Sequence, residues 1–272
     1  MGQELKEIKI SVRNLVEFIL RGGNLDNRGS RSDADAMQAG SKLHRKLQKQ
    51  MGSNYSAEVP LSITVPITRD DISLNLTIEG RADGIINNTV KENDFTPTLL
   101  EEDESTIPEI IIDEIKGMYM DLSLLKEPIG VHKAQAMCYA YIYADKYDHK
   151  QIGIRMTYCN LETENLRYFE ETISFEVLKQ WFGDLIDEYA KWAVWQIKWT
   201  KGRNKSIQSF EFPFPYREGQ KNLVAGVYRT ILRDKNLFIE APTGVGKTIS
   251  TIFPSVKAMG ESIADKIFYL TA

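Results

Sequence analysis

The feature that most constrains this sequence is a glycine-containing loop near its end, Ala241-Pro242-Thr243-Gly244-Val245-Gly246-Lys247-Thr248. Gly244 and Gly246 let the backbone approach a phosphate closely, so that backbone amides and the start of a following helix face the anion. Lys247 would reach the outer phosphates, and the Thr248 hydroxyl would help to hold magnesium. The loop therefore predicts a strand, a phosphate-binding loop and a helix.

The residues around the loop support this order. The apolar run Asn236 to Glu240 predicts a buried strand, and the pattern from Ile249 to Met259 predicts a helix. A nucleotide-hydrolysing domain also needs later strands that carry a metal-holding carboxylate and a water-positioning residue. Only residues 249–272 follow the loop, so we expect residues 203–272 to be the start of a truncated ATP-binding domain of the RecA-like type.

Three segments together resemble the opening of a DinG/XPD-type superfamily 2 DNA helicase. They are Phe212 to Gln220, Glu240 to Thr248, and Phe268 to Ala272. In that family a glutamine upstream of the loop recognises adenine, which implies this role for Gln220, with Tyr216 as a stacking neighbour. Alanine at the first loop position is usual there. The resemblance implies ATP with Mg²⁺ as cofactor, DNA as partner, and ATP-driven unwinding, running 5′ to 3′, in a full-length relative.

Composition limits the class of protein and its compartment. The chain has 272 residues, enough for about two domains, and a net charge of -4, so any DNA site must be a local basic patch. Its charged N-terminal residues predict neither a secretory signal nor a membrane span, and we expect a cytoplasmic protein. Cys138 and Cys159 are too few for a disulfide framework or an iron–sulfur cluster, and we expect both to pack as small apolar residues.

Charge clusters suggest the domain organisation. The basic clusters Lys42 to Lys49 and Lys198 to Lys205 are either solvated helix faces or phosphate contacts. We interpret the acidic stretch from Asn87 to Pro108 as a solvated loop. The second basic cluster marks the expected boundary between a first domain, residues 1–202, and the ATP-binding start, residues 203–272.

Hydrophobic periodicity gives the elements of the first domain. They predict a mixed α/β sandwich with flanking helices. The predicted helices are Ile10 to Leu20, Asp33 to Gln50, Val131 to Tyr147, and Phe175 to about Trp199; the predicted strands are Ala57 to Thr68, Ile72 to Ile86, Glu109 to Met118, Gln151 to Cys159, and Leu166 to Ile173. In the last helix an aromatic stripe from Leu178 to Trp199 is expected to pack against the sheet rather than to stack on nucleic-acid bases.

The third predicted strand carries candidate chemistry. The two-residue period places Glu114 and Lys116 on one face and Asp113 and Ile115 on the other. The preceding strand contributes Asp83. Two carboxylates from neighbouring strands suit a hard divalent cation such as Mg²⁺ or Mn²⁺, and a nearby lysine could orient or help to deprotonate water. Alternatively, Glu114 and Lys116 form a simple ion pair.

Four motifs in order are similar to those of the RecB-like branch of PD-(D/E)XK nucleases: Gly40 with His44, Gly80 to Asp83, Glu114 to Lys116, and Gln135 with Tyr139. In many relatives the strand carries Asp-x-Lys, which leaves Asp113 as a question of register, but the face argument favours Glu114 as the ligand. The resemblance implies two sets of residues. The catalytic set is Asp83, Glu114, Lys116, Gln135 and Tyr139, and the metal-binding set is His44, Asp83, Glu114 and Ile115.

Together these patterns suggest a nuclease domain fused to the start of a helicase. Such a protein would cut DNA ends, flaps or single strands during repair or replication. The alternative is a DNA-docking module that kept the nuclease fold and lost its activity. A P-loop signalling ATPase is a third interpretation, and it requires the motifs expected beyond the loop.

Overall fold

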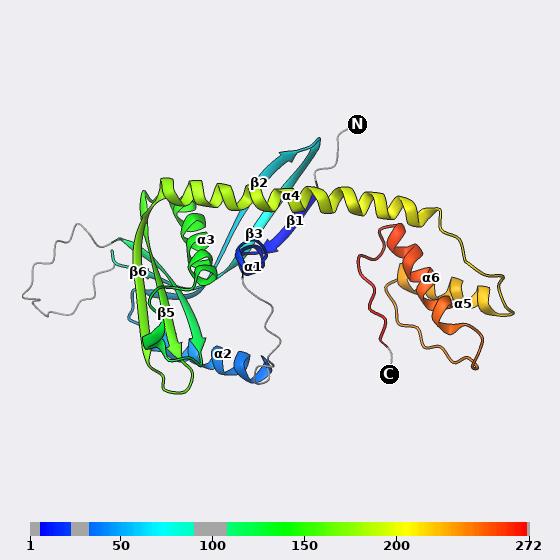
Figure 1. Ribbon diagram of the computed structural model, residues 1–272, viewed down its shortest axis with the longest axis horizontal. Coiled ribbons are helices and arrows are strands. Elements are labelled where there is room, and N and C mark those ends of the chain that lie inside the picture. The colour runs from blue at the N-terminus through cyan, green and yellow to red at the C-terminus, as the bar shows by residue number, and fades with distance from the viewer. Residues whose placement is uncertain (1–5, 23–32, 90–107, 271–272) are drawn as a thin grey trace, which may run out of the picture. The chain divides into compact units, whose positions relative to one another are not determined.

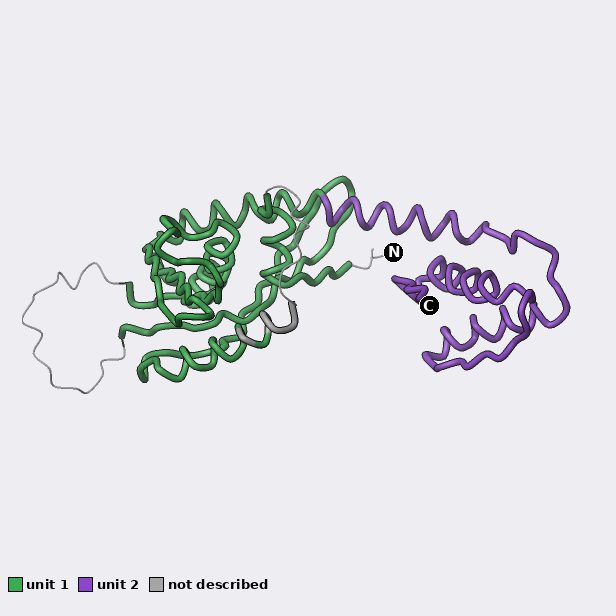
Figure 2. The backbone as a smooth tube through the Cα atoms, turned by 60° about the horizontal axis from the view of Figure 1, so that its bottom comes forward, with its two compact units in different colours: residues 1–191 green, residues 192–272 purple. Residues whose placement is uncertain are grey.

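The computed structural model describes residues 6–22, 33–89 and 108–270. The chain divides into two compact units, residues 1–191 and 192–272 (Figure 2). Helix α4 (Phe175–Gln208) contributes residues to both units, so the boundary expected after residue 202 falls inside a continuous helix. Most of the acidic stretch expected to be a loop, and the last two residues of the segment beginning at Phe268, lie outside the described residues.

One mixed sheet organises the first unit (Figure 1). Its strand order is β1-β3-β4-β5-β6, and β2 pairs with β3 as well. The β1–β3 and β4–β5 pairs are parallel and the others antiparallel. The strands are β1 (Lys6–Ser11), β2 (Tyr55–Arg69), β3 (Ile72–Asn87), β4 (Ile110–Met118), β5 (Gln151–Asn160) and β6 (Leu166–Ser174). The predicted α/β class with a mixed sheet is confirmed.

The long hairpin β2–β3 provides the frame for the sheet. It turns at Asp70 and Asp71, whose φ values of 49° and 62° lie in the left-handed region that short polar residues tolerate. Strand β2 occupies one edge of β3, while β1 and β4 share the other edge. Because β1 pairs only as far as Glu79 and β4 begins at Gly84, residues 80–83 have no described strand partner on that second edge.

Helices cover both faces of the sheet (Figure 1). On the face that carries Ile115, α2 packs Leu43 and Leu47 against the sheet. On the opposite face, the backbone N–H of Ile129, just before α3, donates a hydrogen bond of 2.9 Å to the hydroxyl of Tyr158 on β5. The helices of this unit are α1 (Val12–Leu20), α2 (Asp33–Gln50), the short 3₁₀ helix η1 (Leu122–Leu124), α3 (Gly130–Tyr147) and the first part of α4.

The first predicted helix, Ile10 to Leu20, is wrong at its start. Ile10 belongs to β1, and α1 begins at Val12, where the Ser11 side chain caps the helix by accepting the Asn14 N–H at 3.1 Å. Strand β1 is held by pairing with β3, more than sixty residues away in the chain. Local periodicity does not contain such a long-range pairing.

The long helix α4 also differs from its prediction. It continues past Trp199 to Gln208, because the single Gly202 does not stop it and Ile207 packs closely against Gly260. Of the predicted packing stripe, Leu178, Leu185 and Tyr189 are buried as expected. The prediction is wrong for the last three tryptophans, which are about half exposed. They are Trp192, Trp195 and Trp199, with exposed fractions of 51%, 55% and 49%.

The second unit contains the phosphate-binding loop between α5 (Gln220–Leu232) and α6 (Lys247–Gly260). The helix expected after the loop is confirmed as α6. The strand expected before it, Asn236 to Glu240, is wrong: these residues form no strand, and Phe238 is 94% exposed. A strand needs at least one neighbouring strand to satisfy its backbone hydrogen bonds. The described part of this unit contains none with which it could pair.

Two expectations from composition can be compared with the structure. Cys138 and Cys159 are both buried and not disulfide-bonded, as expected for small apolar residues. Among the helices that the structure describes, none is long and apolar enough to span a membrane.

Candidate active site

Asp113, on one face of β4, is fully buried and accepts hydrogen bonds on both carboxylate oxygens. Arg155 donates from Nε at 3.0 Å and from Nη2 at 2.8 Å, and the Thr157 hydroxyl donates at 2.6 Å. The Tyr55 hydroxyl adds a bond of 3.1 Å. Gly84 makes room for it, since a Cβ there would lie 1.8 Å from the Tyr55 hydroxyl oxygen. Asp113 is therefore a structural carboxylate, and its bonds leave little capacity for a ligand.

Glu114 points to the opposite face and is 4% exposed. Lys116 Nζ donates to Glu114 Oε1 at 2.5 Å, whereas the buried Oε2 has no hydrogen-bond partner. Burial raises the pKa of Glu114 to about 7; the Lys116 charge opposes this shift, and the Asp83 carboxylate reinforces it. A buried carboxylate oxygen without a partner is costly. It is also an open position for a cation, so the residues present fit a divalent metal.

Asp83 and His44 are close enough to Glu114 for their charges to shift its pKa. Asp83 Oδ2 accepts the backbone N–H of Ile115 at 2.8 Å, and Asp83 Oδ1 lies 3.4 Å from His44 Nδ1. Burial disfavours the imidazolium, but the hydrogen bond and charge of Asp83 outweigh it and raise the pKa of His44. The Ile115 side chain is fully buried among Leu43 and Leu47. Any contribution of Ile115 to a metal must therefore come from its backbone carbonyl.

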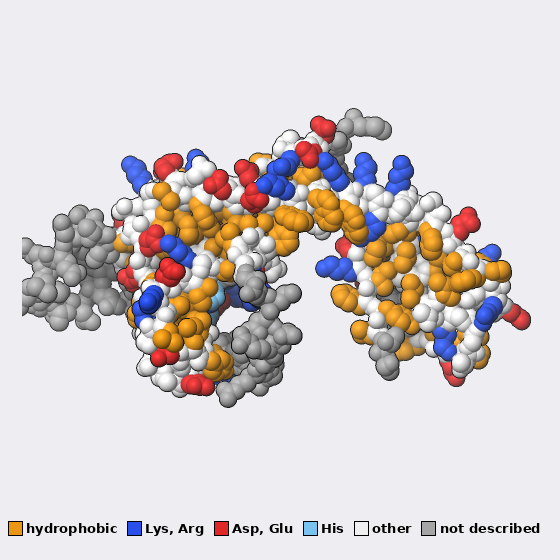
Figure 3. Space-filling model, viewed as in Figure 1, with side chains coloured by type: hydrophobic (Ala, Val, Ile, Leu, Met, Phe, Trp, Pro, Cys, Tyr) orange, Lys and Arg blue, Asp and Glu red, His pale blue; other side chains and the backbone are white. Residues whose placement is uncertain are grey.

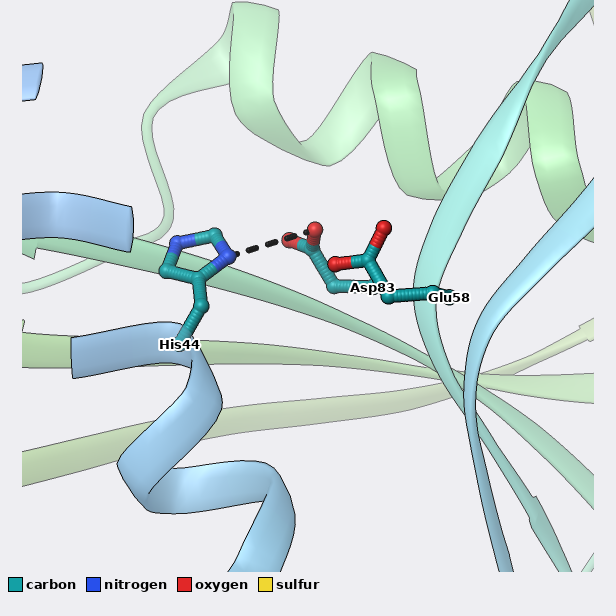
Figure 4. Close-up of side chains that lie close together, drawn as sticks. All are labelled: His44, Glu58 and Asp83. Carbon is teal, nitrogen blue, oxygen red and sulfur yellow. Dashed lines mark ion pairs between the residues drawn. The ribbon is translucent and has the colours of Figure 1, made fainter. Parts of the chain in front are cut away.

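Glu58, on β2, is a further member of this cluster that the sequence interpretation missed. Ligand atoms of His44, Glu58 and Asp83 lie within 4.8 Å of one another, and the three side chains point together (Figure 4). The hairpin register pairs Ala57 with Gly84 and Val59 with Ala82, so Glu58 stands opposite Asp83. The turn at residues 69–72 already sets this register. The strand ends predicted from the sequence, Thr68 and Ile72, are one residue out of this register, which is why Glu58 was not identified.

The two residues of α3 that the sequence predicted for the site, Gln135 and Tyr139, are both buried. Gln135 is 4% and Tyr139 is 7% exposed. The Tyr139 hydroxyl hydrogen-bonds the backbone of Arg81, in the stretch of the β3 edge that none of the described strands pairs with. Gly80 allows this approach, because a Cβ there would lie 2.5 Å from the hydroxyl oxygen. The gap between β1 and β4 is thus filled by a tyrosine from α3, which fixes the helix beside Asp83.

The phosphate-binding loop in the second unit has its own internal contacts. Gly244 and Gly246 have φ values of 86° and 78°, which favour glycine. Lys247 Nζ donates to the carbonyls of Ala241 at 2.9 Å and Pro242 at 3.1 Å, so the lysine folds back over its own loop. These carbonyl contacts occupy the ammonium that was predicted to reach phosphate.

The other predicted nucleotide-binding residues surround this loop. Gln220 is 6% exposed and donates from Nε2 to the Val245 carbonyl at 3.2 Å, so it supports the loop. The Tyr269 and Thr248 hydroxyls are 3.3 Å apart. Tyr216 stacks on Phe212, with ring centroids 4.2 Å apart. Residues from the three segments that suggested a helicase therefore lie together in this unit.

The fold and the site define an α/β protein with a mixed sheet, flanking helices and a half-buried cluster of carboxylates, histidine and lysine. No known family model matches the chain. A stretch of 47 residues is 45% identical to a probable ATP-dependent helicase of Methanocaldococcus jannaschii. That stretch is 17% of this chain and 7% of the helicase, so the match spans a small part of the relative's length.

The similarity to solved structures is at a low level. The crystal structure of SSO0001 aligns with 68% of this chain and 77% of its own, at 17% sequence identity and a TM-score of 0.37. A likeness at this level carries no conclusion about fold or function.

Proposed function

We propose that this chain is a metal-dependent nuclease of the RecB-like PD-(D/E)XK type, joined to the ATP-binding start of a DinG/XPD-like DNA helicase. The observation that carries the nuclease proposal is the environment of the Glu114 carboxylate. Its buried Oε2 lacks a partner, Lys116 holds its other oxygen, and the charges of Asp83 and His44 act on the same carboxylate. The large majority of buried side-chain polar atoms have a hydrogen-bond partner, so an oxygen without one at this depth requires an explanation.

The proposed metal ligands are His44, Asp83, Glu114 and the backbone carbonyl of Ile115, with Glu58 within reach of the first two. Oxygen and imidazole donors of this kind suit Mg²⁺ or Mn²⁺. A bound divalent ion would lower the pKa of a coordinated water and polarise the phosphodiester.

The remaining side chains of the proposed site orient the reacting groups or hold the metal ligands in place. Lys116, 23% exposed at its side chain, can turn from Glu114 to donate a hydrogen bond to a phosphate oxygen or to the attacking water. Tyr139 bonds to the Arg81 backbone and holds the Gly80 to Asp83 segment in place against α3. Gln135, buried on the same helix, supports that arrangement. We propose that DNA ends, flaps or single strands enter here during repair or replication.

The helicase part of the proposal has separate support. It rests on the phosphate-binding loop, on the contacts of Gln220 and Tyr269 with it, and on the short match to a probable ATP-dependent helicase. We propose that residues 203–272 begin an ATP-binding domain and that Lys247 leaves its carbonyl partners when ATP and Mg²⁺ bind. In a longer protein, strand movement driven by ATP would feed the nuclease domain, residues 1–202.

The test is cleavage of labelled single-stranded and flapped DNA with Mg²⁺ or Mn²⁺, comparing the wild-type chain with Lys116→Ala and Asp83→Ala. We expect cleavage to fall at least 100-fold in both variants, in line with the usual size of acid–base and electrostatic contributions, roughly 10²–10⁴-fold. Glu176→Gln removes an exposed carboxylate of α4 and is the matched control. It should cleave as the wild type does.

Isothermal titration with Mn²⁺ distinguishes the nuclease from the DNA-docking alternative. A working site binds the ion in the wild type and loses it in Asp83→Ala. Wild-type protein that binds DNA but neither binds Mn²⁺ nor cleaves would reject the nuclease and favour the docking module.

A further inference from the structure

The C-terminal half of α4 carries an exposed row of tryptophans that the proposed nuclease and ATP sites do not use. Trp192, Trp195 and Trp199 are spaced by three and four residues, so they lie on one face of the helix. Each is about half exposed, whereas Ala193 and Val194, on the opposite side, are 1% and 3% exposed. Large indoles on the solvent side of a helix require an explanation.

The rings form a continuous series that ends in an arginine. Trp192 and Trp195 meet edge to face at 6.3 Å, and Trp195 and Trp199 stack with centroids 6.0 Å apart at 20°. The Arg203 guanidinium lies 5.0 Å over the Trp199 ring. Eleven residues of helix extend the series over about 16 Å. The indoles and the guanidinium are planar groups on which nucleic-acid bases can stack.

The C-terminal part of α4 is positively charged and therefore complementary to the phosphates of a nucleic acid. Residues 192–208 contain four basic residues and no Asp or Glu. The basic residues are Lys198, Lys201, Arg203 and Lys205. Hydrophobic and basic side chains lie side by side along α4 on the face drawn in Figure 3. Protein–protein interfaces favour Trp and Arg but are depleted in Lys. Stacking rings combined with lysines are instead typical of surfaces that bind single-stranded nucleic acid.

We propose that this surface, the tryptophan row of α4, binds single-stranded DNA by stacking bases on Trp192, Trp195 and Trp199. The flanking lysines contact the phosphates. The inference does not depend on the proposed nuclease, because it concerns other residues and a step without chemistry. Binding is therefore tested in EDTA, where no metal-dependent cleavage can occur.

The experiment titrates the whole chain with a fluorescein-labelled oligothymidylate and follows anisotropy and tryptophan emission. Three of the four tryptophans belong to the row, so emission should be quenched on binding. Trp195→Ala with Trp199→Ala should weaken binding at least tenfold, given the usual loss per stacked base. Trp195→Phe with Trp199→Phe keeps aromatic faces and should retain most of the affinity. Trp181→Phe, outside the row, is the control and should bind as the wild type does.

A second pair of changes leaves every ring in place. Lys201→Gln with Lys205→Gln should reduce the slope of log affinity against log salt by about 1.4, because each phosphate contact on a single strand contributes about 0.7. A duplex of the same length should bind at least tenfold more weakly, since its bases are not free to stack. Circular dichroism verifies that each variant keeps its helix content.

Four results would overturn the proposal. The first is unchanged oligothymidylate affinity in a folded alanine double variant, and the second is an unchanged salt slope in the glutamine variant. The third is equal affinity for duplex and single strand. The fourth is a wild-type dimer that the alanine variant converts to monomer without loss of DNA binding, which would assign the row to contact between two copies of the chain.

Discussion

At the residue scale, Asp113 and Glu114 are adjacent in the sequence and have opposite environments. Asp113 accepts hydrogen bonds from Arg155, Thr157 and Tyr55, and Glu114 keeps one buried oxygen without any. The alternation of a strand produces this difference, because neighbouring side chains face different helices. It also explains why the carboxylate adjacent to Glu114 is not the one that we propose as a metal ligand.

This contrast gives the first prediction. Asp113→Asn should lower the free energy of unfolding by about 3 kcal/mol or more, because it leaves Arg155 without its charge partner inside the fold. Glu114→Gln should change it by less than about 1 kcal/mol, since glutamine keeps an oxygen for Lys116. Urea unfolding measures both. Asp145→Asn, an exposed carboxylate on α3, is the control.

The same variants also distinguish the structural role of Asp113 from the proposed metal-binding role of Glu114. Glu114→Gln should weaken Mn²⁺ binding at least about tenfold, because it removes an anionic oxygen ligand. If Asp113→Asn were neutral in stability while Glu114→Gln unfolded the protein, the assignment of the two carboxylates would have to be exchanged.

His132, on α3, gives a prediction about pH. Its Nδ1 lies 3.3 Å from the Tyr158 hydroxyl oxygen, and its pKa is lowered from 6.5 to about 4. Burial is the main cause of this shift; the charges of Lys116 and Arg13 contribute to it, and Glu17 opposes it. Between pH 6.5 and 4 the unfolded chain binds more protons at this residue than the folded chain does. Its contribution to stability is therefore present above pH 6.5 and is lost as the pH falls towards 4.

The measurement compares wild type with His132→Asn by urea unfolding in EDTA at pH 7 and pH 4.5. After allowance for the partial exposure of the ring, the wild type should lose about 1–2 kcal/mol more than the variant. Any constant loss of contacts cancels in this difference. If both proteins lost the same free energy of unfolding between pH 7 and pH 4.5, His132 would not contribute to the loss of stability in acid.

At the scale of elements, the gap on the edge of β3 places the site beside α3. Strand β1 ends its pairing at Glu79 and β4 begins at Gly84, so the segment between them is bound by a helix side chain instead of a strand. Tyr139 fills that position only because Gly80 has no side chain. A sheet without this gap would have no room for the tyrosine and would leave Asp83 in a regular ladder.

The third prediction therefore concerns Gly80. Gly80→Ala should displace the Tyr139 hydroxyl, because its Cβ would lie 2.5 Å from that oxygen, and cleavage should fall at least tenfold. Gly80→Ala combined with Tyr139→Phe removes the clashing oxygen and should recover part of the stability lost by the single change. Thermal unfolding and cleavage assays test both variants.

Gly183→Ala, in α4, is the matched control for these changes. No atom lies within 4 Å of its Cβ position, and alanine favours a helix, so stability should rise by up to about 1 kcal/mol. Full activity in Gly80→Ala would show that the position of Tyr139 does not govern the site.

At the scale of the whole molecule, the two candidate sites belong to different compact units, each with its own internal contacts. Lys116 is bonded within the first unit, and Lys247 is bonded to its own loop in the second. Sites without shared partners should respond to substitution independently.

The fourth prediction is a double dissociation between these lysines. Lys116→Ala should abolish metal-dependent DNA cleavage and leave the affinity for a fluorescent ATP analogue unchanged. Lys247→Ala should weaken analogue binding at least tenfold and leave cleavage in the absence of ATP within about twofold of the wild type. Loss of cleavage in Lys247→Ala would show that the two sites are coupled.

Much of this architecture follows from the sequence alone. Period-two and period-3.6 patterns locate β2 to β6 and α2 to α4 because each pattern reflects one face turned to the core. The same alternation places Glu114 and Lys116 together and Asp113 apart. Regular spacing and turn chemistry are local properties, so a linear sequence displays them directly.

Other features depend on contacts between distant residues, and only the tertiary structure determines them. Strand β1 exists through its pairing with β3, and Glu58 joins His44 and Asp83 across the hairpin. Packing leaves one oxygen of Glu114 without a partner and about half of Trp192, Trp195 and Trp199 exposed. The sequence by itself determined which faces are apolar and where carboxylates leave the strands. Which groups those faces meet, and which atoms they leave unsatisfied, depends on long-range packing that no local pattern contains.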